Sequence, residues 1–368
     1  MQDLQPRIEE IGRQLLASAR AAEGRKSRLA RGIDAFVAHL SDNDELRVRA
    51  LRLIDVLPTL RDDRQLVNHL QQYFGDAKLP LPGALRWGLD HAGNTAWPAA
   101  VAPAARRWVA WLGSRFIAGD SADAAWKTIR QLQRSGRQAT LDLLGEDVRS
   151  EAEADAYQQR YLALIEALGP RMQQAGTPLS LSLKASALDS QLTPLTEARS
   201  SIRIRDRLRP ILRALLAYGG SLTLDMEHYD HKATTLRVFR DLLDEAEFRD
   251  CGSCGIALQA YLRECEADLA ELIDWAVKRA APVHVRLVRG AYWDTETVIA
   301  RREGWPSPVW ESKAETDRSY ERCLSLLLEN HHAVRPAIAG HNVRSLAVAM
   351  AQIEAMRLRP EVYEFQML

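Results

Sequence analysis

The chain has 368 residues, of which 46% are apolar and 27% charged, a globular composition that excludes a disordered or fibrous protein. Its 49 basic and 49 acidic residues balance, which argues against a nucleic-acid-binding protein because such proteins need a basic surface. The N-terminus lacks a signal-peptide pattern, no apolar stretch reaches the length of a spanning helix, and four cysteines are too few for a disulfide framework, so we expect a cytoplasmic protein.

Residues 1–135 are predicted to form an N-terminal helical arm and helical segment. Apolar residues recur at helical spacing from Leu46 to Leu57, and Pro58 ends the pattern. Five tryptophans follow between positions 87 and 126, and we interpret them as aromatic packing between helices.

From Ala139 onward, short strand-like runs alternate with longer helical ones, which is typical of βα units around a parallel sheet. The predicted helices include Ser150–Leu168, Ile204–Tyr218 and Ala267–Arg279. The predicted strands are Ala139–Leu144, Leu179–Lys184, Ser221–Met226, Gly255–Gln259, Val283–Val288, Pro336–Ala339 and Val362–Gln366. A (β/α)8 barrel needs eight strands and about 250 residues. We therefore predict an α/β, TIM-like barrel over residues 136–368 with its last βα unit missing.

The strands alternate between apolar and polar residues. In a barrel the outward side chains meet the helices, while inward side chains at the carboxyl ends of the strands face the active site. The inward positions converge on a polar cup formed by Asp142, Lys184, Asp225, Gln259, Arg286, His341 and Gln366. Buried charges are costly without partners, so a cup for a charged ligand is favoured over a ring of ion pairs that plugs the barrel.

Several other motifs admit a chemical reading. Lys184 alone permits a Schiff-base aldolase. Glu227–His231 has metal-ligating residue types, but solvated loop residues are the favoured interpretation, and we expect no metal. Cys251-Gly-Ser-Cys254 is only half of a zinc site. The six arginines from Arg199 to Arg213 are interpreted as the solvent-exposed face of an amphipathic helix. The sequence has neither a Rossmann turn nor a P-loop.

A series of short segments runs through the second part of the chain: 115–119 (RFIAG), 141–146 (LDLLGE), 184–188 (KASAL), 224–229 (LDMEHY), 255–263 (GIALQAYLR), 285–296 (VRLVRGAYWDTE), 311–320 (ESKAETDRSY), 340–345 (GHNVRS) and 364–368 (EFQML). Together and in this order, these segments resemble the proline dehydrogenase domain of the bifunctional proline-utilisation flavoproteins. Asp55–Arg61 resembles the helical lead-in of one branch of that family.

The resemblance implies a distorted barrel that binds FAD, transfers hydride from L-proline to flavin N5 to give 1-pyrroline-5-carboxylate, and passes electrons to quinone at a peripheral membrane contact. It implies that Asp225 and Arg286 are catalytic, and that Lys184 and Tyr292 bind substrate. The cofactor-binding positions implied are Met226, Gln259, Arg286, Val288, Arg289, Gly290, Ala291, Trp293, Gly340, His341, Asn342 and Gln366. It further implies a homo-oligomer and a C-terminal aldehyde dehydrogenase domain in the full-length protein.

The sequence departs from the family at three places. Arg289 replaces a lysine, which keeps the charge but changes its geometry, and Gly340 replaces a hydroxyl residue. The family's final βα unit, with an arginine pair for the proline carboxylate, has no counterpart, so we expect the chain as given to bind proline and FAD weakly. Two other interpretations stay open: a non-catalytic truncated barrel that acts as a folding or assembly module, and the Schiff-base aldolase.

Overall fold

A computed structural model describes residues 4–24, 43, 45, 48–49, 52, 62–76, 117–145 and 147–367. The chain divides into two compact units: residues 1–16 with 121–368, and residues 17–120. Most of the predicted helix at Leu46–Leu57, the Asp55–Arg61 segment and four of the five tryptophans lie outside the described residues. The predicted domain boundary at residue 135 stays a prediction.

Three described helices precede the sheet. Helix α1 (Gln5–Gly24) buries Ile8 and Ile11, and Arg7 donates a 2.8 Å hydrogen bond to Glu354 on α14 (Val343–Met356). In the second unit, α4 (Asp63–Phe74) begins where the side chain of Asp62 accepts a hydrogen bond from a backbone N–H. Helix α7 (Ala122–Arg134) is capped in the same way by a serine at position 121.

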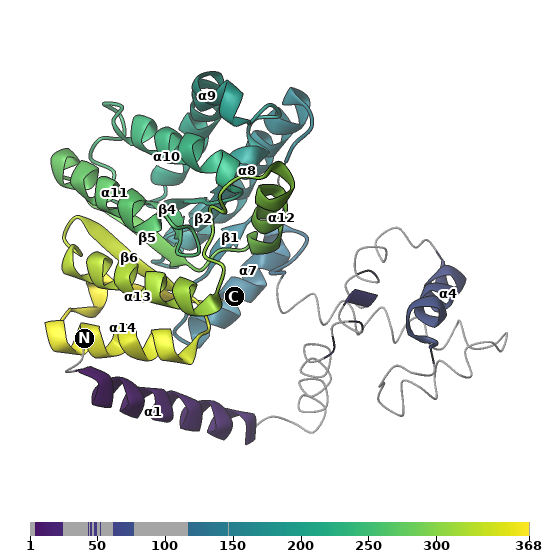
Figure 1. Ribbon diagram of the computed structural model, residues 1–368. Coiled ribbons are helices and arrows are strands. Elements are labelled where there is room, and N and C mark those ends of the chain that lie inside the picture. The colour runs from purple at the N-terminus through teal and green to yellow at the C-terminus, as the bar shows by residue number, and fades with distance from the viewer. Residues whose placement is uncertain are drawn as a thin grey trace. The chain divides into compact units, whose positions relative to one another are not determined.

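The sheet has seven parallel strands in sequence order, and it curls into an incomplete barrel with helices around it (Figure 1). The strands are β1 (Thr140–Asp142), β2 (Ser180–Lys184), β3 (Ser221–Asp225), β4 (Cys254–Gln259), β5 (Val283–Val288), β6 (Val334–Ala339) and β7 (Glu364–Gln366). All seven predicted strands are confirmed; half of their ends lie where they were predicted, and the other half are shifted by one or two residues. The incomplete α/β barrel predicted from the sequence is therefore the observed fold.

The helices between the strands are α8 (Glu151–Gln174), α9 (Glu197–Leu216), α10 (Tyr229–Leu243), α11 (Cys265–Arg279), α12 (Trp293–Glu303), α13 (Lys313–Glu329) and α14. The end predicted for α8 at Leu168 is wrong, because the helix continues through Gly169 and Pro170. A Cβ at Gly169 would lie 2.4 Å from the ring of Tyr218, so this glycine is needed for the close approach of the aromatic ring. None of the described helices is long and apolar enough to cross a membrane.

Strand alternation positions the site. On β5, Val283, Val285 and Leu287 are fully buried, whereas His284, Arg286 and Val288 alternate with them and are only partly buried. Burying one branched side chain contributes about 1.5–3 kcal/mol, which sets the register of the strand. The three fully buried residues pack outward, and the alternating residues, among them Arg286, are left on the inner face.

The arginines of α9 pair with acids of neighbouring elements. Arg207 donates to Glu151 and Asp155, at 2.9 and 2.7 Å, and Arg209 donates to Glu245 at 2.7 Å. The helix predicted from this arginine-rich run is confirmed, and its charges hold α9 between α8 and the end of α10.

Candidate active site

Arg286 joins four strands at the inner face of the sheet. Its Nε donates to the Gln366 side chain on β7 at 2.6 Å, and one terminal nitrogen donates to the Ser182 hydroxyl on β2 at 2.7 Å. The same nitrogen forms an ion pair with Asp225 on β3. Only 13% of the Arg286 side chain is exposed, so the guanidinium is held in one orientation with little access to water.

Asp225 is the carboxylate partner of this guanidinium. Burial raises its pKa, while the nearby charges of Arg286 and Lys184 act in the opposite direction. The ion pair with Arg286 therefore offsets part of the cost of burying this carboxylate. The sequence left either Lys184 or Arg286 as the partner of Asp225, and the ion pair is formed with Arg286.

Lys184 lies directly beside Asp225 in the register of β2 and β3, but it forms its ion pair with Asp142 on β1 at 2.7 Å. Tyr161 on α8 donates to the Ser182 carbonyl at 2.9 Å, and its hydroxyl lies 3.4 Å from Asp142. The inner face of the sheet thus carries two ion pairs: Asp142–Lys184 joins β1 and β2, and Asp225–Arg286 joins β3 and β5.

A second group surrounds Arg289, which follows β5. Its guanidinium donates to Asp317 at 2.8 Å and to the Ser345 hydroxyl at 2.6 Å, and it lies 4.7 Å from the ring centroid of Tyr320. A Cβ at Gly340 would lie 3.2 Å from this guanidinium, so the glycine leaves the arginine room. Asn342 caps α14 by accepting a 3.1 Å hydrogen bond from the Ser345 N–H.

Tyr292 belongs to a third group at the start of α12. Its ring lies 4.1 Å from the His228 ring, centroid to centroid. Glu296, which is buried, lies 3.3 Å from His228 Nδ1 and accepts a 2.9 Å hydrogen bond from the Tyr229 N–H. Gly290 has φ 125° and lies against the ring of Tyr261, where a Cβ would approach to 2.4 Å.

The remaining predicted cofactor positions differ in burial. Gln259 is buried and donates to the Met226 carbonyl at 3.2 Å, and its amide oxygen has no hydrogen-bond partner among the described residues. Val288 is partly buried, whereas Ala291, Trp293 and His341 are exposed. Trp293 donates from its indole to the Trp310 carbonyl at 2.8 Å.

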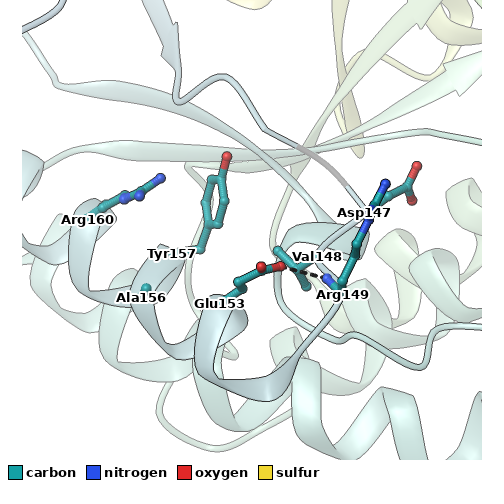
Figure 2. Close-up of a pocket in the computed structure, with 7 residues that line it drawn as sticks. All are labelled: Asp147, Val148, Arg149, Glu153, Ala156, Tyr157 and Arg160. Atoms are coloured by element: carbon teal, nitrogen blue, oxygen red, sulfur yellow. Dashed lines mark hydrogen bonds between the residues drawn. The ribbon is translucent and has the colours of Figure 1, made fainter.

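A separate pocket of about 450 Å³ lies beside the start of α8. Figure 2 shows Tyr157 and Arg160 projecting from the helix, with Glu153 bonded to the Arg149 backbone at 2.7 Å. The lining residues are Asp147, Val148, Arg149, Glu153, Ala156, Tyr157 and Arg160. None of the residues predicted for substrate or cofactor lines this pocket.

The sequence analysis is wrong about part of Glu227–His231, which it treated as solvated loop. Glu227 is buried and accepts a 3.0 Å hydrogen bond from the Ser186 N–H, and Tyr229 begins α10. Glu227, His231 and Asp147 bring ligand-type atoms within 4.8 Å of one another. Glu227 is also held by both the backbone and the hydroxyl of Ser186, and the absence of a metal expected from the sequence stays a prediction.

Two residues near the candidate site, Ser182 beside Arg286 and Glu296 beside His228, have no role in the sequence prediction of the site. Ser182 occupies the inner face of β2, so its position was visible in the alternation, but its contact with Arg286, 104 positions later in the chain, was not. Glu296 was missed because nothing in a single sequence shows that it reaches His228 and Tyr229 across 67 or more positions.

A curled parallel sheet with charged side chains at the carboxyl ends of its strands defines a barrel of the enzyme class. Residues 125–368 match the family model for proline dehydrogenase, and residues 5–116 match the model for the proline utilization A N-terminal domain. The chain therefore belongs to the proline dehydrogenase family.

Individual relatives agree with this assignment. Proline dehydrogenase 1 of Bacillus subtilis is 31% identical over 69% of this chain and 73% of its own length. Bifunctional protein PutA of Escherichia coli is 31% identical over 70% of this chain, which corresponds to 20% of that protein. A crystal structure of proline utilization A from Bdellovibrio bacteriovorus, inactivated by N-propargylglycine, superposes on 100% of this chain and 37% of its own, with 33% identity and a TM-score of 0.85. The chain thus spans about a fifth of the bifunctional relatives.

Proposed function

We propose that the chain oxidises L-proline to 1-pyrroline-5-carboxylate with FAD. The observation that carries this proposal is the guanidinium of Arg286, fixed by Asp225, Ser182 and Gln366 at the carboxyl ends of the strands. A bound FAD would supply the hydride acceptor, flavin N5, for the hydrogen at C5 of proline. A fixed cation beside that acceptor stabilises negative charge as it develops, without reorganisation during the reaction.

The proposed roles of the other polar residues follow from their charges. Lys184 supplies a cation for the proline carboxylate, and Asp142 orients that cation at 2.7 Å. Tyr292, whose ring lies at 47° to the ring of His228, presents its ring beside the substrate. Asp225 orients Arg286 and keeps its charge balanced before the substrate arrives.

The residues present fit a flavin. The buried amide oxygen of Gln259 has no partner among the described residues, and such an acceptor suits the N–H groups of a flavin ring. Gly290 and Gly340, with φ 125° and 148°, adopt backbone conformations that favour glycine, and both belong to the proposed cofactor contacts. Arg289 and the N-terminus of α14 would offer positive potential to the phosphates. Met226, Val288, Ala291, Trp293, His341 and Asn342 complete the proposed contacts.

Further parts of the proposal rest on the resemblance alone. Electrons pass from the reduced cofactor to a quinone, and the chain works as a homo-oligomer joined to an aldehyde dehydrogenase domain. A cytoplasmic location with a peripheral membrane contact stays a prediction.

Two alternatives make different predictions. An aldolase would use Lys184 as a free amine, whereas its ion pair with Asp142 engages it as a cation. A folding or assembly module would not need Arg286 to be held in one orientation. In this structure three side chains, those of Asp225, Ser182 and Gln366, hold it.

The test is an anaerobic titration of the FAD-loaded protein with L-proline, followed by flavin absorbance. We expect bleaching with L-proline and none with D-proline, and inactivation by N-propargylglycine, the compound named for the Bdellovibrio relative. Retention of the oxidised spectrum at saturating L-proline would contradict the proposal. Trapping of a carbonyl substrate on Lys184 by borohydride would favour the aldolase instead.

A further inference from the structure

Two cysteines face each other at the end of the barrel opposite to the Arg286 site. Cys254 is the first residue of β4, whose last residue is Gln259, and Cys251 lies in the preceding loop. Their sulfur atoms are 3.2 Å apart. Both are free thiols, so the structure places the two sulfur atoms of a reduced Cys-Gly-Ser-Cys pair close enough to form a disulfide after a small movement.

The loop that carries Cys251 is held in place. Arg279, near the end of α11, donates 2.8 Å hydrogen bonds to the carbonyls of Cys251 and Phe248. On the other side, the Ser253 hydroxyl donates to the Gly220 carbonyl at 3.1 Å. The approach of the two sulfur atoms is therefore imposed by the surrounding fold.

The two thiols differ in the way that a reactive pair requires. Cys254 is 3% exposed, whereas Cys251 is partly exposed and within reach of small molecules. Hydrogen bonds from the Cys254 thiol and then from Ser253 lower the pKa of Cys251 to about 5, with a further contribution from the charge of Arg279. Cys251 is thus the nucleophile and Cys254 the resolving thiol.

We propose that Cys251 and Cys254 form a thiol–disulfide redox site that reacts with low-molecular-weight disulfides of the glutathione type. The Cys251 thiolate attacks one sulfur of the oxidant, forms a mixed disulfide and releases the first thiolate. Cys254 then loses its proton, attacks the Cys251 sulfur and releases the second. Two protein thiols are oxidised to one disulfide, and one small disulfide is reduced to two thiols.

The surroundings do not favour a metal at this pair. Structural zinc takes four ligands. Among the described residues, the grouping of three or more metal-ligating side chains lies elsewhere, at Asp147, Glu227 and His231. Two sulfur atoms without further ligands are better suited to exchange chemistry.

The chain contains its own matched control. Cys265 on α11 and Cys323 on α13 have sulfur atoms 3.8 Å apart, but they are 1% and 0% exposed. Proximity is similar in the two pairs, whereas access differs. If access and thiolate character decide reactivity, only the Cys251–Cys254 pair will exchange.

Peptide mapping of the folded protein, treated with oxidised glutathione and then denatured and alkylated, tests the proposal. The tryptic peptide Asp250–Arg263 contains both cysteines of the pair and no other cysteine. We expect this peptide to lose two hydrogens and both alkylation sites, reversibly with dithiothreitol, while Cys265 and Cys323 stay alkylated.

Two variants separate the steps. Cys254→Ser should retain glutathione as a stable adduct on Cys251, and Cys251→Ser should form neither adduct nor disulfide. In the unmutated protein, iodoacetamide at pH 6 should label Cys251 at least about tenfold faster than Cys254. Full alkylation of Asp250–Arg263 after oxidant treatment would overturn the proposal, and so would equal oxidation of Cys265 and Cys323.

Discussion

The Nε of Arg286 on β5 donates a 2.6 Å hydrogen bond to Oε1 of Gln366 on β7, 80 residues later in the chain. The same guanidinium reaches Ser182 on β2, three strands away in the other direction. In a flat sheet three strand spacings amount to about 14 Å, which exceeds the reach of an arginine side chain. The curl of the sheet is therefore what assembles the candidate active site.

The connection between β5 and α12 approaches Tyr261 closely at Gly290, and a substitution there shows how much this contact constrains the fold. Gly290→Ala should lower the free energy of unfolding by about 3 kcal/mol, because φ 125° is strained for alanine and its Cβ would approach the Tyr261 ring to 2.4 Å. Gly304→Ala is the matched control, with φ 68° and open space around the new Cβ, and should lose only about 1 kcal/mol. Urea unfolding of both variants checks this, and equal losses would mean that the tyrosine does not constrain Gly290.

The ionisation of Glu151, which pairs α8 with Arg207 of α9, should make the stability of the fold depend on pH. Hydrogen bonds from Ser190, and then from Arg207, lower its pKa from 4.5 to about 2. A carboxyl whose pKa is lower in the folded state stabilises the fold above pH 4.5 and loses that contribution as the pH falls through about 2. The difference in unfolding free energy between the native protein and Glu151→Gln should therefore shrink over this range.

The control for this measurement is Glu166→Gln, an exposed position on the same helix. Its difference from the native protein should stay small and vary little with pH. A Glu151→Gln difference that is constant from pH 5 to 2 would show that the Ser190 and Arg207 contacts do not form in solution.

Much of the fold could be predicted from the sequence because its signals are local. Strand β5 was predicted with its observed ends, Val283 and Val288, since three branched residues alternate with three others and turns bound the run. The inward direction of Arg286, Asp225 and Lys184 followed from the same alternation. Helix ends were less predictable: Gly169 and Pro170 predict an end at Leu168, whereas α8 continues to Gln174 and Gly169 lies against the ring of Tyr218, a contact that no local signal shows.

The pairing within the site could not be predicted from alternation. Asp142 and Asp225 flank Lys184 on the two neighbouring strands, so both are candidates for its partner. The choice depends on side-chain geometry: Arg286 crosses the barrel and takes Asp225, which leaves Asp142 for Lys184. The burial of Glu227 likewise depends on Ser186, 41 positions earlier in the chain.

Lys184 and Asp142 should act together on substrate binding, if Lys184 holds the proline carboxylate. Lys184→Met should raise the Kd for proline, taken from the proline dependence of flavin reduction, by about 10- to 100-fold, the loss of one charge-assisted hydrogen bond. A double-mutant cycle with Asp142→Asn should give a coupling energy above about 0.5 kcal/mol. The exposed pair Arg322–Glu266, 2.8 Å apart, provides a control cycle with no coupling on this Kd. Additive effects of Lys184→Met and Asp142→Asn would show that the ion pair does not position the lysine.

Stabilisation of charge by Arg286 during proline oxidation is measurable as the rate of single-turnover flavin reduction in a stopped-flow instrument. Arg286→Lys and Arg286→Gln are compared with Arg335→Lys, since Arg335 is an exposed arginine near the opposite end of the neighbouring strand β6. We expect Arg286→Gln to slow reduction about 100-fold or more at saturating proline, Arg286→Lys to recover part of the rate, and Arg335→Lys to match the native protein. An unchanged reduction rate in FAD-loaded Arg286→Gln would contradict this role of Arg286.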